Sequence, residues 1–288
     1  LWAEQFDALG SFIDFDPGVG RVGKVASGYA VIDGARVGPR TPAPSAAAGA
    51  PVEWAPRPSA AEATKGAAGR PYLGLRVLEF GVAGAGPEIS RLLSEYGADV
   101  VKVECPARPD LFRLLGGPSG IGATFASSNR SKRSIAIDFT REDGASRVLD
   151  LVRTADVVIE NLALGTLERF GLGPDAFCAV NPDVLVVSSQ SMGRRGPWAR
   201  WRGYGGNTQL PSGMSYLWSF PDAPEPVPQN VAFPDHFIGR LGALLVASDL
   251  VGRYHGSGGA RHIEIAQVEM ALNLLADLLF EESVEPGS

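Results

Sequence analysis

Residues 75–104 read LRVLEFGVAGAGPEISRLLSEYGADVVKVE, and this stretch decides the fold. The apolar run Leu75–Phe80 is long enough for a buried strand, and the glycines of Gly81–Pro87 let the backbone turn sharply after it. Apolar residues then recur with the spacing of one helix face, at Ile89, Leu92, Leu93 and Tyr96. Pro87 is predicted at the first helical position, and Asp99–Glu104 supplies a second strand. The stretch therefore predicts a βαβ unit, which is parallel and right-handed.

The glycine-rich turn of this unit is the first candidate binding site, because ligands of parallel α/β folds lie at the carboxyl ends of the strands. One hypothesis is a nicotinamide-dinucleotide site, since Glu104 lies about where the ribose-binding acid belongs. The spacing, however, is G-x-x-G-x-G, whereas the dinucleotide fingerprint is G-x-G-x-x-G. The turn is compatible with an anion or nucleotide site, and also with a tight turn that only packs the helix against the sheet.

The alternation of strands and helices continues along the chain. Repeated alternation at this length predicts an α/β fold with a Rossmann-like, doubly wound parallel sheet. Thr140 is a candidate cap for the helix that follows it. The predicted elements are strands at Ser134–Asp138, Asp156–Glu160, Asp183–Ser189 and His262–Ile265, helices over Arg141–Thr154, Pro174–Val180, Phe237–Arg253 and Gln267–Phe280, and an irregular loop over Cys105–Ser128.

Two segments precede this α/β domain. Residues 1–40 contain a short helix candidate, Leu1–Leu9, and short β-type runs that form no core of their own. In residues 41–70 more than half of the positions are Ala or Pro, a composition typical of a linker. The main domain is therefore predicted over residues 71–288.

Composition and charge narrow the class of protein. The 288 residues are 45% hydrophobic, enough for one sizeable core, and the net charge of −6 with scattered basic residues argues against nucleic acid as a partner. No apolar run is long enough to span a membrane. Cys105 and Cys178 are too few for a disulfide framework, and His236, His255 and His262 lack metal-ligand spacing. We expect a cytoplasmic protein without a metal site.

Asp235 is the most interesting carboxylate of the chain. It comes directly before a predicted long helix, where Asp is a preferred N-cap, and capping alone would explain it. A carboxylate at a helix N-terminus is also held ionised by the helix dipole, which suits a nucleophile, and its neighbours Phe233, Pro234 and Phe237 are apolar. Both interpretations remain open from the residues alone.

Other polar residues have a structural and a functional interpretation. Arg169 and Arg202 can bind phosphates, although isolated surface cations are usually only solvated. Asn161 follows a strand and is either a turn residue or a ligand contact, with the turn favoured. Tyr204, beside three glycines, either belongs to the core or lines a pocket.

Six ordered stretches together resemble the class III coenzyme A transferases, the family that includes formyl-CoA and carnitine CoA-transferases and α-methylacyl-CoA racemase. The resemblance runs from Pro71 to about Leu279 and implies the large domain of that family, with the small domain missing. The stretches are LGLRVLEF with GAGP, GADVVKVE, NRSKRSIAIDF, DVVIENLALGTLERFGLG, NPDVLVVSSQSMG and GSGGARHIEIAQVEMALNLL.

The resemblance implies that CoA or acyl-CoA binds as a substrate over the first glycine-rich turn, and that no cofactor is bound permanently. It places the catalytic aspartate of the family on Asp235, whose carboxylate attacks an acyl-CoA thioester to give a mixed anhydride and then an aspartyl-CoA thioester, from which an acceptor acid takes the CoA. The residues implied to surround CoA are Gly84, Ala85, Ile137, Asp138, Phe139, Thr140, Asn161, Leu162, Ala163, Arg169, Arg202 and Tyr204.

The chain also departs from the family pattern. Cys105 stands where a basic residue is expected after the second strand, so a phosphate contact is lost or passes to Arg108. Tyr204 stands where racemase members have a histidine, which argues against an acyl-CoA racemase. Residues 1–40 resemble the closing segment of the family, which suggests a tandem protein of two halves. Family members form interlocked dimers, so we expect a homodimer or a pairing of two halves within one chain. A non-catalytic half that scaffolds an active partner half is the alternative.

Overall fold

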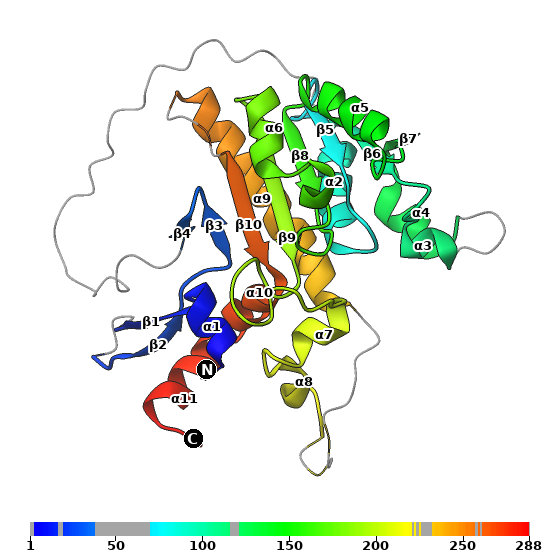
Figure 1. Ribbon diagram of the computed structural model, residues 1–288. Coiled ribbons are helices and arrows are strands. Elements are labelled where there is room, and N and C mark those ends of the chain that lie inside the picture. The colour runs from blue at the N-terminus through cyan, green and yellow to red at the C-terminus, as the bar shows by residue number, and fades with distance from the viewer. Residues whose placement is uncertain are drawn as a thin grey trace.

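The computed structural model describes residues 3–16, 20–37, 70–115, 121–220, 222, 225, 232–256, 259 and 261–287, and is organised around one large sheet (Figure 1). Its strands are β3 (Ala30–Ile32), β4 (Ala35–Val37), β5 (Arg76–Glu79), β6 (Asp99–Glu104), β7 (Arg133–Ala136), β8 (Val157–Glu160), β9 (Leu185–Gln190) and β10 (His262–Ala266). Within the described residues their order is β4-β3-β10-β9-β8-β5-β6-β7. The strands from β10 to β7 are parallel, whereas β3 pairs antiparallel with both β10 and β4.

The order of the parallel strands explains where a ligand can bind. Numbered along the chain from β5, they follow the order 3-2-1-4-5-6 of dinucleotide-binding α/β folds. The winding direction reverses between β5 and β8, and ligands of open α/β sheets bind in the crevice at such a reversal. The predicted Rossmann-like α/β fold is confirmed. The predicted doubly wound parallel sheet is formed by β5 to β10, and β3 and β4 from the N-terminal segment add an antiparallel edge to it.

Helices cover both faces of the sheet (Figure 1). On one face, α2 (Ala85–Glu95) and α9 (Phe233–Tyr254) bury residues such as Ile89 and Ile238 against Val77 of β5. On the other face, α5 (Glu142–Val152) and α6 (Pro174–Val180) bury Val148 and Phe177 in a second cluster. Every position of β8 and β9 is buried, as expected for central parallel strands that are covered on both sides.

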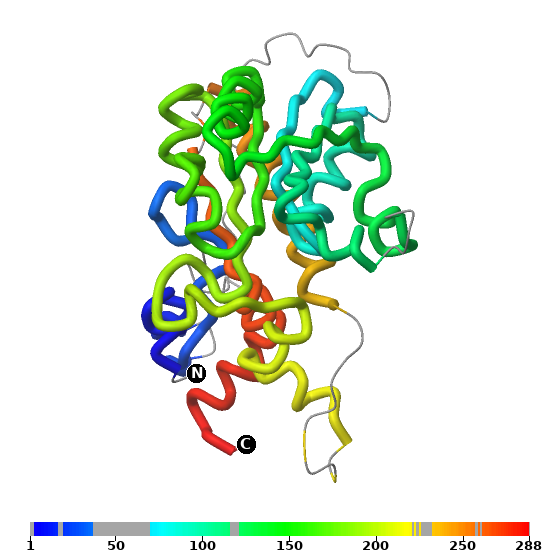
Figure 2. Tube along the Cα trace, turned by 45° about the vertical axis from the view of Figure 1, so that its right-hand side comes forward, coloured from blue at the N-terminus to red at the C-terminus, as the bar shows by residue number. Residues whose placement is uncertain are grey.

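The shorter elements connect this framework. Figure 2 shows the first and last elements of the chain at the same end of the molecule as α7 and α8. The remaining elements of the described residues are α1 (Glu4–Leu9), β1 (Phe12–Phe15), β2 (Gly23–Ala26), α3 (Leu111–Leu114), α4 (Ala123–Asn129), a short 3₁₀ helix (Glu168–Phe170), α7 (Gly205–Gln209), α8 (Met214–Leu217), α10 (Gln267–Leu274) and α11 (Ala276–Val284).

The N-terminal segment folds onto the main domain. β1 and β2 form an antiparallel hairpin, and β2 lies so close to α11 that a Cβ added at Gly23 would be 2.6 Å from side-chain atoms of Phe280 and Val284. Phe6 of α1 is buried in a cluster with Met192 and Leu272 of the main domain. The segment therefore has no separate core, as predicted, and shares one with the α/β domain. The predicted linker, residues 41–70, lies outside the described residues except for Arg70.

Two predicted helix starts differ from the structure. The long helix α9 begins at Phe233, so Asp235 is its third residue and the N-cap is Ala232; the N-cap interpretation of Asp235 is wrong. Pro234 belongs in the first turn because that turn requires no N–H from it. In the same way α2 begins at Ala85, which puts Pro87 at its third residue.

Tertiary contacts explain the other differences. Thr140 does not cap α5, because its hydroxyl donates to Asp138 Oδ1 at 2.6 Å instead. The predicted loop Cys105–Ser128 contains α3 and most of α4. The predicted final helix is divided at Leu275, and the break directs α11 onto the hairpin of the N-terminal segment.

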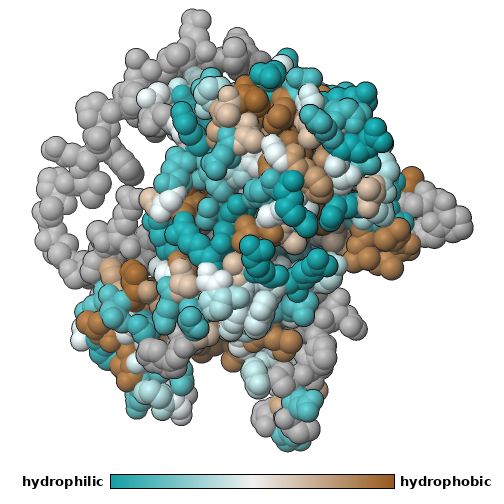
Figure 3. Space-filling model, in the orientation of Figure 1, coloured by the Kyte–Doolittle hydropathy of each residue, from teal (hydrophilic) through white to brown (hydrophobic). Residues whose placement is uncertain are grey.

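The surface is mainly polar and has local apolar areas. Figure 3 shows polar side chains over most of one face and an apolar area near α3, where Leu114, Leu115 and Ile121 are exposed. Among the helices of the described residues, none combines the length and apolar character needed to cross a membrane.

Candidate functional site

A cavity of about 410 Å³ opens at the carboxyl ends of β5, β8 and β9, where the winding of the sheet reverses. The segments after these three strands supply most of its wall, and Val103 of β6, the segment after β6, and Phe139 after β7 supply the rest. Its lining residues are Phe80, Val82, Ala83, Val103, Arg108, Pro109, Leu111, Phe139, Asn161, Leu162, Ala163, Leu164, Thr166, Arg169, Gln190, Ser191, Ala199, Trp201, Arg202, Gly203 and Tyr204. The position agrees with the crevice that the strand order predicts.

Arginines give this largely apolar cavity a positive charge. Arg108, Arg169 and Arg202 line it, and the guanidinium groups of Arg108 and Arg169 lie 5.7 and 5.9 Å from the ring centre of Phe170. An adjoining groove of about 470 Å³ shares Arg169 and Arg202 and adds Arg200. Within the part of the chain that the structure describes, none of these arginines forms an ion pair with a carboxylate. Their charge is therefore available to an anion with several negative groups.

The loop after β5 is held rigidly at the edge of the cavity. Asn161, at the end of β8, accepts from Val82 N at 2.8 Å and donates to Val82 O at 2.9 Å. The Asp110 carboxylate accepts from Ala83 N at 3.1 Å. Asn161 thus ties the two strands at the reversal of the sheet to each other, and it also lines the cavity; its contact with a ligand stays a prediction.

A buried network of charges lies beneath this loop. The Lys102 ammonium is 3.1 Å from both Glu79 Oε1 and Asp110 Oδ2, and it donates to the carbonyl oxygen of Gly81. Lys132 is 2.8 Å from Glu79 Oε2. Burial alone would raise the pKa of Glu79, but the two ammonium groups outweigh it and lower this pKa to about 2.

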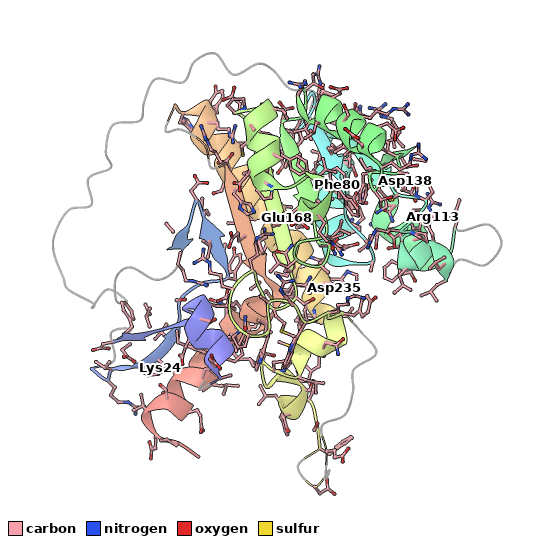
Figure 4. All side chains as sticks on the ribbon, viewed as in Figure 1. Lys24, Phe80, Arg113, Asp138, Glu168 and Asp235 are labelled. Atoms are coloured by element: carbon pink, nitrogen blue, oxygen red, sulfur yellow. The ribbon has the colours of Figure 1, made fainter. Side chains whose placement is uncertain are left out.

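Asp235 lies beside the cavity, in the first turn of α9, where Figure 4 shows it near the lower end of the sheet. A Cβ added at Gly84 would be 2.6 Å from Asp235 Oδ2, and one added at Gly205 would be 3.3 Å from it. The carboxylate therefore lies between two glycines whose neighbours, Ala83 and Tyr204, line the cavity. Side chains at either glycine would cover it.

Burial raises the pKa of Asp235 from 3.8 to about 6, and nearby Glu88 acts in the same direction while His236 opposes it. Burial therefore opposes the helix N-terminus, which was expected to favour the ionised form of this carboxylate. Glu88 itself is paired with Arg91 at 2.8 and 3.1 Å, and His236 Nδ1 is 3.5 Å from Glu88 Oε2. At neutral pH most Asp235 side chains remain ionised and poorly hydrated.

The structure brings together many of the residues that the sequence singled out. Those that line the cavity are Phe139, Asn161, Leu162, Ala163, Arg169, Arg202 and Tyr204. Gly84 contacts Asp235, and Ala85 and Ile137 are buried beside the site. Asp138 and Thr140 bond to each other in the turn before α5. These last five residues do not line the cavity. Contact with CoA stays a prediction for all twelve residues.

Several lining residues were not predicted. Gln190 ends β9 and Ser191 follows it, and the rule that sites lie at strand ends could have found them. Trp201 has no local signal, since its place depends on the long loop before α7. Glu104, considered as a ribose-binding acid, is bound by Arg113 at 2.5 and 2.6 Å, so it does not serve a dinucleotide.

Comparison with known proteins agrees with this geometry. The model of CoA-transferase family III matches residues 72–287. The chain belongs to CoA-transferase family III. A crystal structure of a CaiB/BaiF family protein from Brucella suis has 36% sequence identity and a TM-score of 0.70, and the match covers 76% of this chain and 59% of that one. The recognition made from the six stretches is confirmed.

Two curated relatives in CoA-transferase family III extend the comparison. A probable CoA-transferase of Mycobacterium tuberculosis is 36% identical over 98% of this chain and 36% of its own length. The succinate–glutarate CoA-transferase of Agrobacterium fabrum is 35% identical over 72% of this chain and 53% of its own. The chain thus spans between about a third and a half of the length of these relatives.

Proposed function

We propose that the protein transfers coenzyme A between an acyl-CoA thioester and a carboxylic acid, with Asp235 as the nucleophile. The observation that carries this proposal is the carboxylate of Asp235 between Gly84 and Gly205, beside a cavity with an apolar interior and three arginines in its lining. A nucleophilic carboxylate needs access to the substrate and poor hydration, and this position offers both.

The cavity suits the chemistry of CoA. Its apolar walls fit the pantetheine arm and an aromatic base, and its arginines fit the phosphate groups. The adjoining groove extends the cationic surface through Arg200, so that more than one phosphate can be neutralised. Arg108 takes the role of the basic residue that Cys105 replaces, because it lines the cavity and Cys105 is buried.

The reaction proceeds by acyl exchange at Asp235. The carboxylate attacks the thioester carbonyl, the C–S bond breaks, and the products are a mixed anhydride and CoA thiolate. The thiolate attacks the aspartyl carbonyl, releases the donor acid as its carboxylate, and leaves an aspartyl-CoA thioester. An acceptor carboxylate then repeats the exchange in reverse order and departs as the new acyl-CoA, which restores the Asp235 carboxylate. No net proton is consumed, so the site needs an ionised nucleophile and no general base.

We also propose that residues 1–40 are the closing segment of a preceding transferase half and that the two halves pair with each other. In support, the family model begins only at residue 72, yet the relative from Mycobacterium tuberculosis aligns with 98% of this chain. The contacts of α1 and the β1–β2 hairpin with α10 and α11 provide a physical basis for the pairing.

Trapping of the covalent intermediate tests the catalytic proposal. The protein is incubated with a panel of acyl-CoAs and quenched with hydroxylamine, which attacks the aspartyl carbonyl, expels CoA thiolate and leaves a hydroxamate. We expect mass spectrometry to locate the hydroxamate on Asp235 and to find none in Asp235→Asn. The matched control Asp277→Asn changes an exposed acid in the first turn of α11 and should be labelled like the wild type. A protein that binds CoA but never yields the adduct would show that this half is a scaffold.

A further inference from the structure

The N-terminal helix α1 lies against a loop that forms part of the cavity wall. This loop, Ser191–Tyr204, joins β9 to α7. Besides Ser191, six of its residues line the cavity or the adjoining groove: Ala199, Arg200, Trp201, Arg202, Gly203 and Tyr204. Helix α1, which lies outside the family match, therefore contacts the cavity indirectly, through this loop.

Gln5 makes the most specific of these contacts. Its side chain is fully buried and bonds three backbone groups of the loop. The amide nitrogen donates to Met192 O and to Arg195 O, each at 2.7 Å, and the amide oxygen accepts from Trp198 N at 2.7 Å. A single side chain thus fixes three points of the loop, over more than 180 residues of sequence separation.

The loop is shaped to fit α1 at two glycines. Gly193 and Gly196 have φ values of +79° and +85°, which side chains rarely adopt. An added Cβ would be 2.7 Å from Leu9 Cδ2 at Gly193 and 2.5 Å from Gln5 Oε1 at Gly196. The close approach is therefore observed independently of the hydrogen bonds of Gln5.

Aromatic contacts carry this restraint to the cavity. The ring of Phe6, the residue after Gln5, meets Trp198 edge-on at 5.8 Å. Trp198 stacks on Trp201 with ring centres 4.8 Å apart and an angle of 14° between the planes. Trp201 lines the cavity beside Arg202, so the position of α1 determines where both residues lie.

We propose that Gln5 is a positioning residue of the CoA site, which acts through the loop Ser191–Tyr204 to place Trp201 and Arg202. This inference rests on the proposed function for the identity of the ligand. It assigns a role in substrate binding to the N-terminal segment and makes the cavity incomplete without it.

Titration of the full chain with CoA in a calorimeter tests the role of Gln5. Gln5→Leu keeps the size of the side chain and removes all three hydrogen bonds, and we expect its Kd for CoA to rise at least about tenfold, a loss of about 1.4 kcal/mol. Glu4→Gln changes an exposed residue on the same helix and should bind as the wild type does. In turnover, the KM for acyl-CoA should rise in Gln5→Leu while the KM for the acceptor acid stays unchanged.

A second variant approaches the same contact from the loop. Gly196→Ala places a methyl group against Gln5 and should weaken CoA binding in the same way, whereas Gly206→Ala meets no atom within 4 Å and should not. The circular-dichroism couplet of the stacked Trp198–Trp201 pair should decrease in both Gln5→Leu and Gly196→Ala, and trypsin should cleave the loop faster after Arg195 and Arg200.

The possible results separate the two proposals. Wild-type CoA affinity in a folded Gln5→Leu or Gly196→Ala would overturn the role of Gln5 and leave the proposed function intact. So would weaker binding with an unchanged Trp couplet, because the effect would not run through the loop. A wild-type protein that does not bind CoA would overturn the proposed function, and this inference with it.

Discussion

Replacement of Asp235 by asparagine should abolish the covalent adduct and at the same time stabilise the fold. Burial raises the pKa of Asp235 from 3.8 to about 6, which means that the folded state holds its ionised form at a cost. The shift corresponds to at most about 3 kcal/mol at neutral pH, and partial exposure of the side chain reduces the expected gain to roughly 1–3 kcal/mol. Asparagine has nearly the same shape and carries no charge, so it avoids this cost.

The pH dependence gives the prediction a definite sign. A carboxyl group with a raised folded-state pKa destabilises the protein where it must ionise, so the cost is complete above pH 6 and disappears as pH falls through the unfolded value of 3.8. Asp235→Asn should therefore be more stable than the wild type at pH 7.5 and about equally stable near pH 4. Urea denaturation at both pH values measures the difference.

A competing effect makes this prediction refutable. Asp235 lies in the first turn of α9, where the helix dipole favours a negative charge by about 0.3–1 kcal/mol. If the dipole dominated, Asp235→Asn would be less stable than the wild type at pH 7.5, and the explanation of its raised pKa would be wrong. The control Asp277→Asn removes an exposed acid from the first turn of α11, where the dipole acts without burial, and it should show no gain.

Three further outcomes follow from the site. The rate of CoA transfer should fall about tenfold per pH unit below pH 6 as Asp235 is protonated, and a rate that stays constant down to pH 4.5 would contradict this. Lys102→Met leaves the buried Asp110 carboxylate without its ammonium partner and leaves Glu79 paired with Lys132 alone, and it should cost about 3–5 kcal/mol in urea denaturation, whereas Arg133→Met, at an exposed ion pair, should cost less than about 1 kcal/mol. Equal losses would refute the importance of the buried network. Arg108→Ala should weaken CoA binding roughly tenfold and flatten its salt dependence, while exposed Arg147→Ala on α5 should not, which titration at two salt concentrations would measure.

Local patterns in the sequence were sufficient for the framework of the fold. The glycine-rich turn, the helix stripe from Ile89 and the apolar runs at β8 and β9 each predict their own element, because strand and helix periodicity depend on neighbours a few residues away. The position of the cavity followed from the same information, since sites lie at the carboxyl ends of parallel strands. The recognition of Asp235 depended on the resemblance, because a carboxylate near a helix start is ordinarily only structural.

Contacts between distant parts of the chain decided the rest. The antiparallel edge of the sheet arises where β3 meets β10, across more than 200 residues, and no local pattern indicates such a partner. The raised pKa of Asp235 depends on the loop around Gly84, which removes water from a carboxylate on another element. The approach of Gln5 to the loop before α7 also exists only in the folded chain. Sequence determined which elements form and where a ligand can bind. Burial and packing, which depend on tertiary structure, determined how acidic Asp235 is and what holds the cavity in shape.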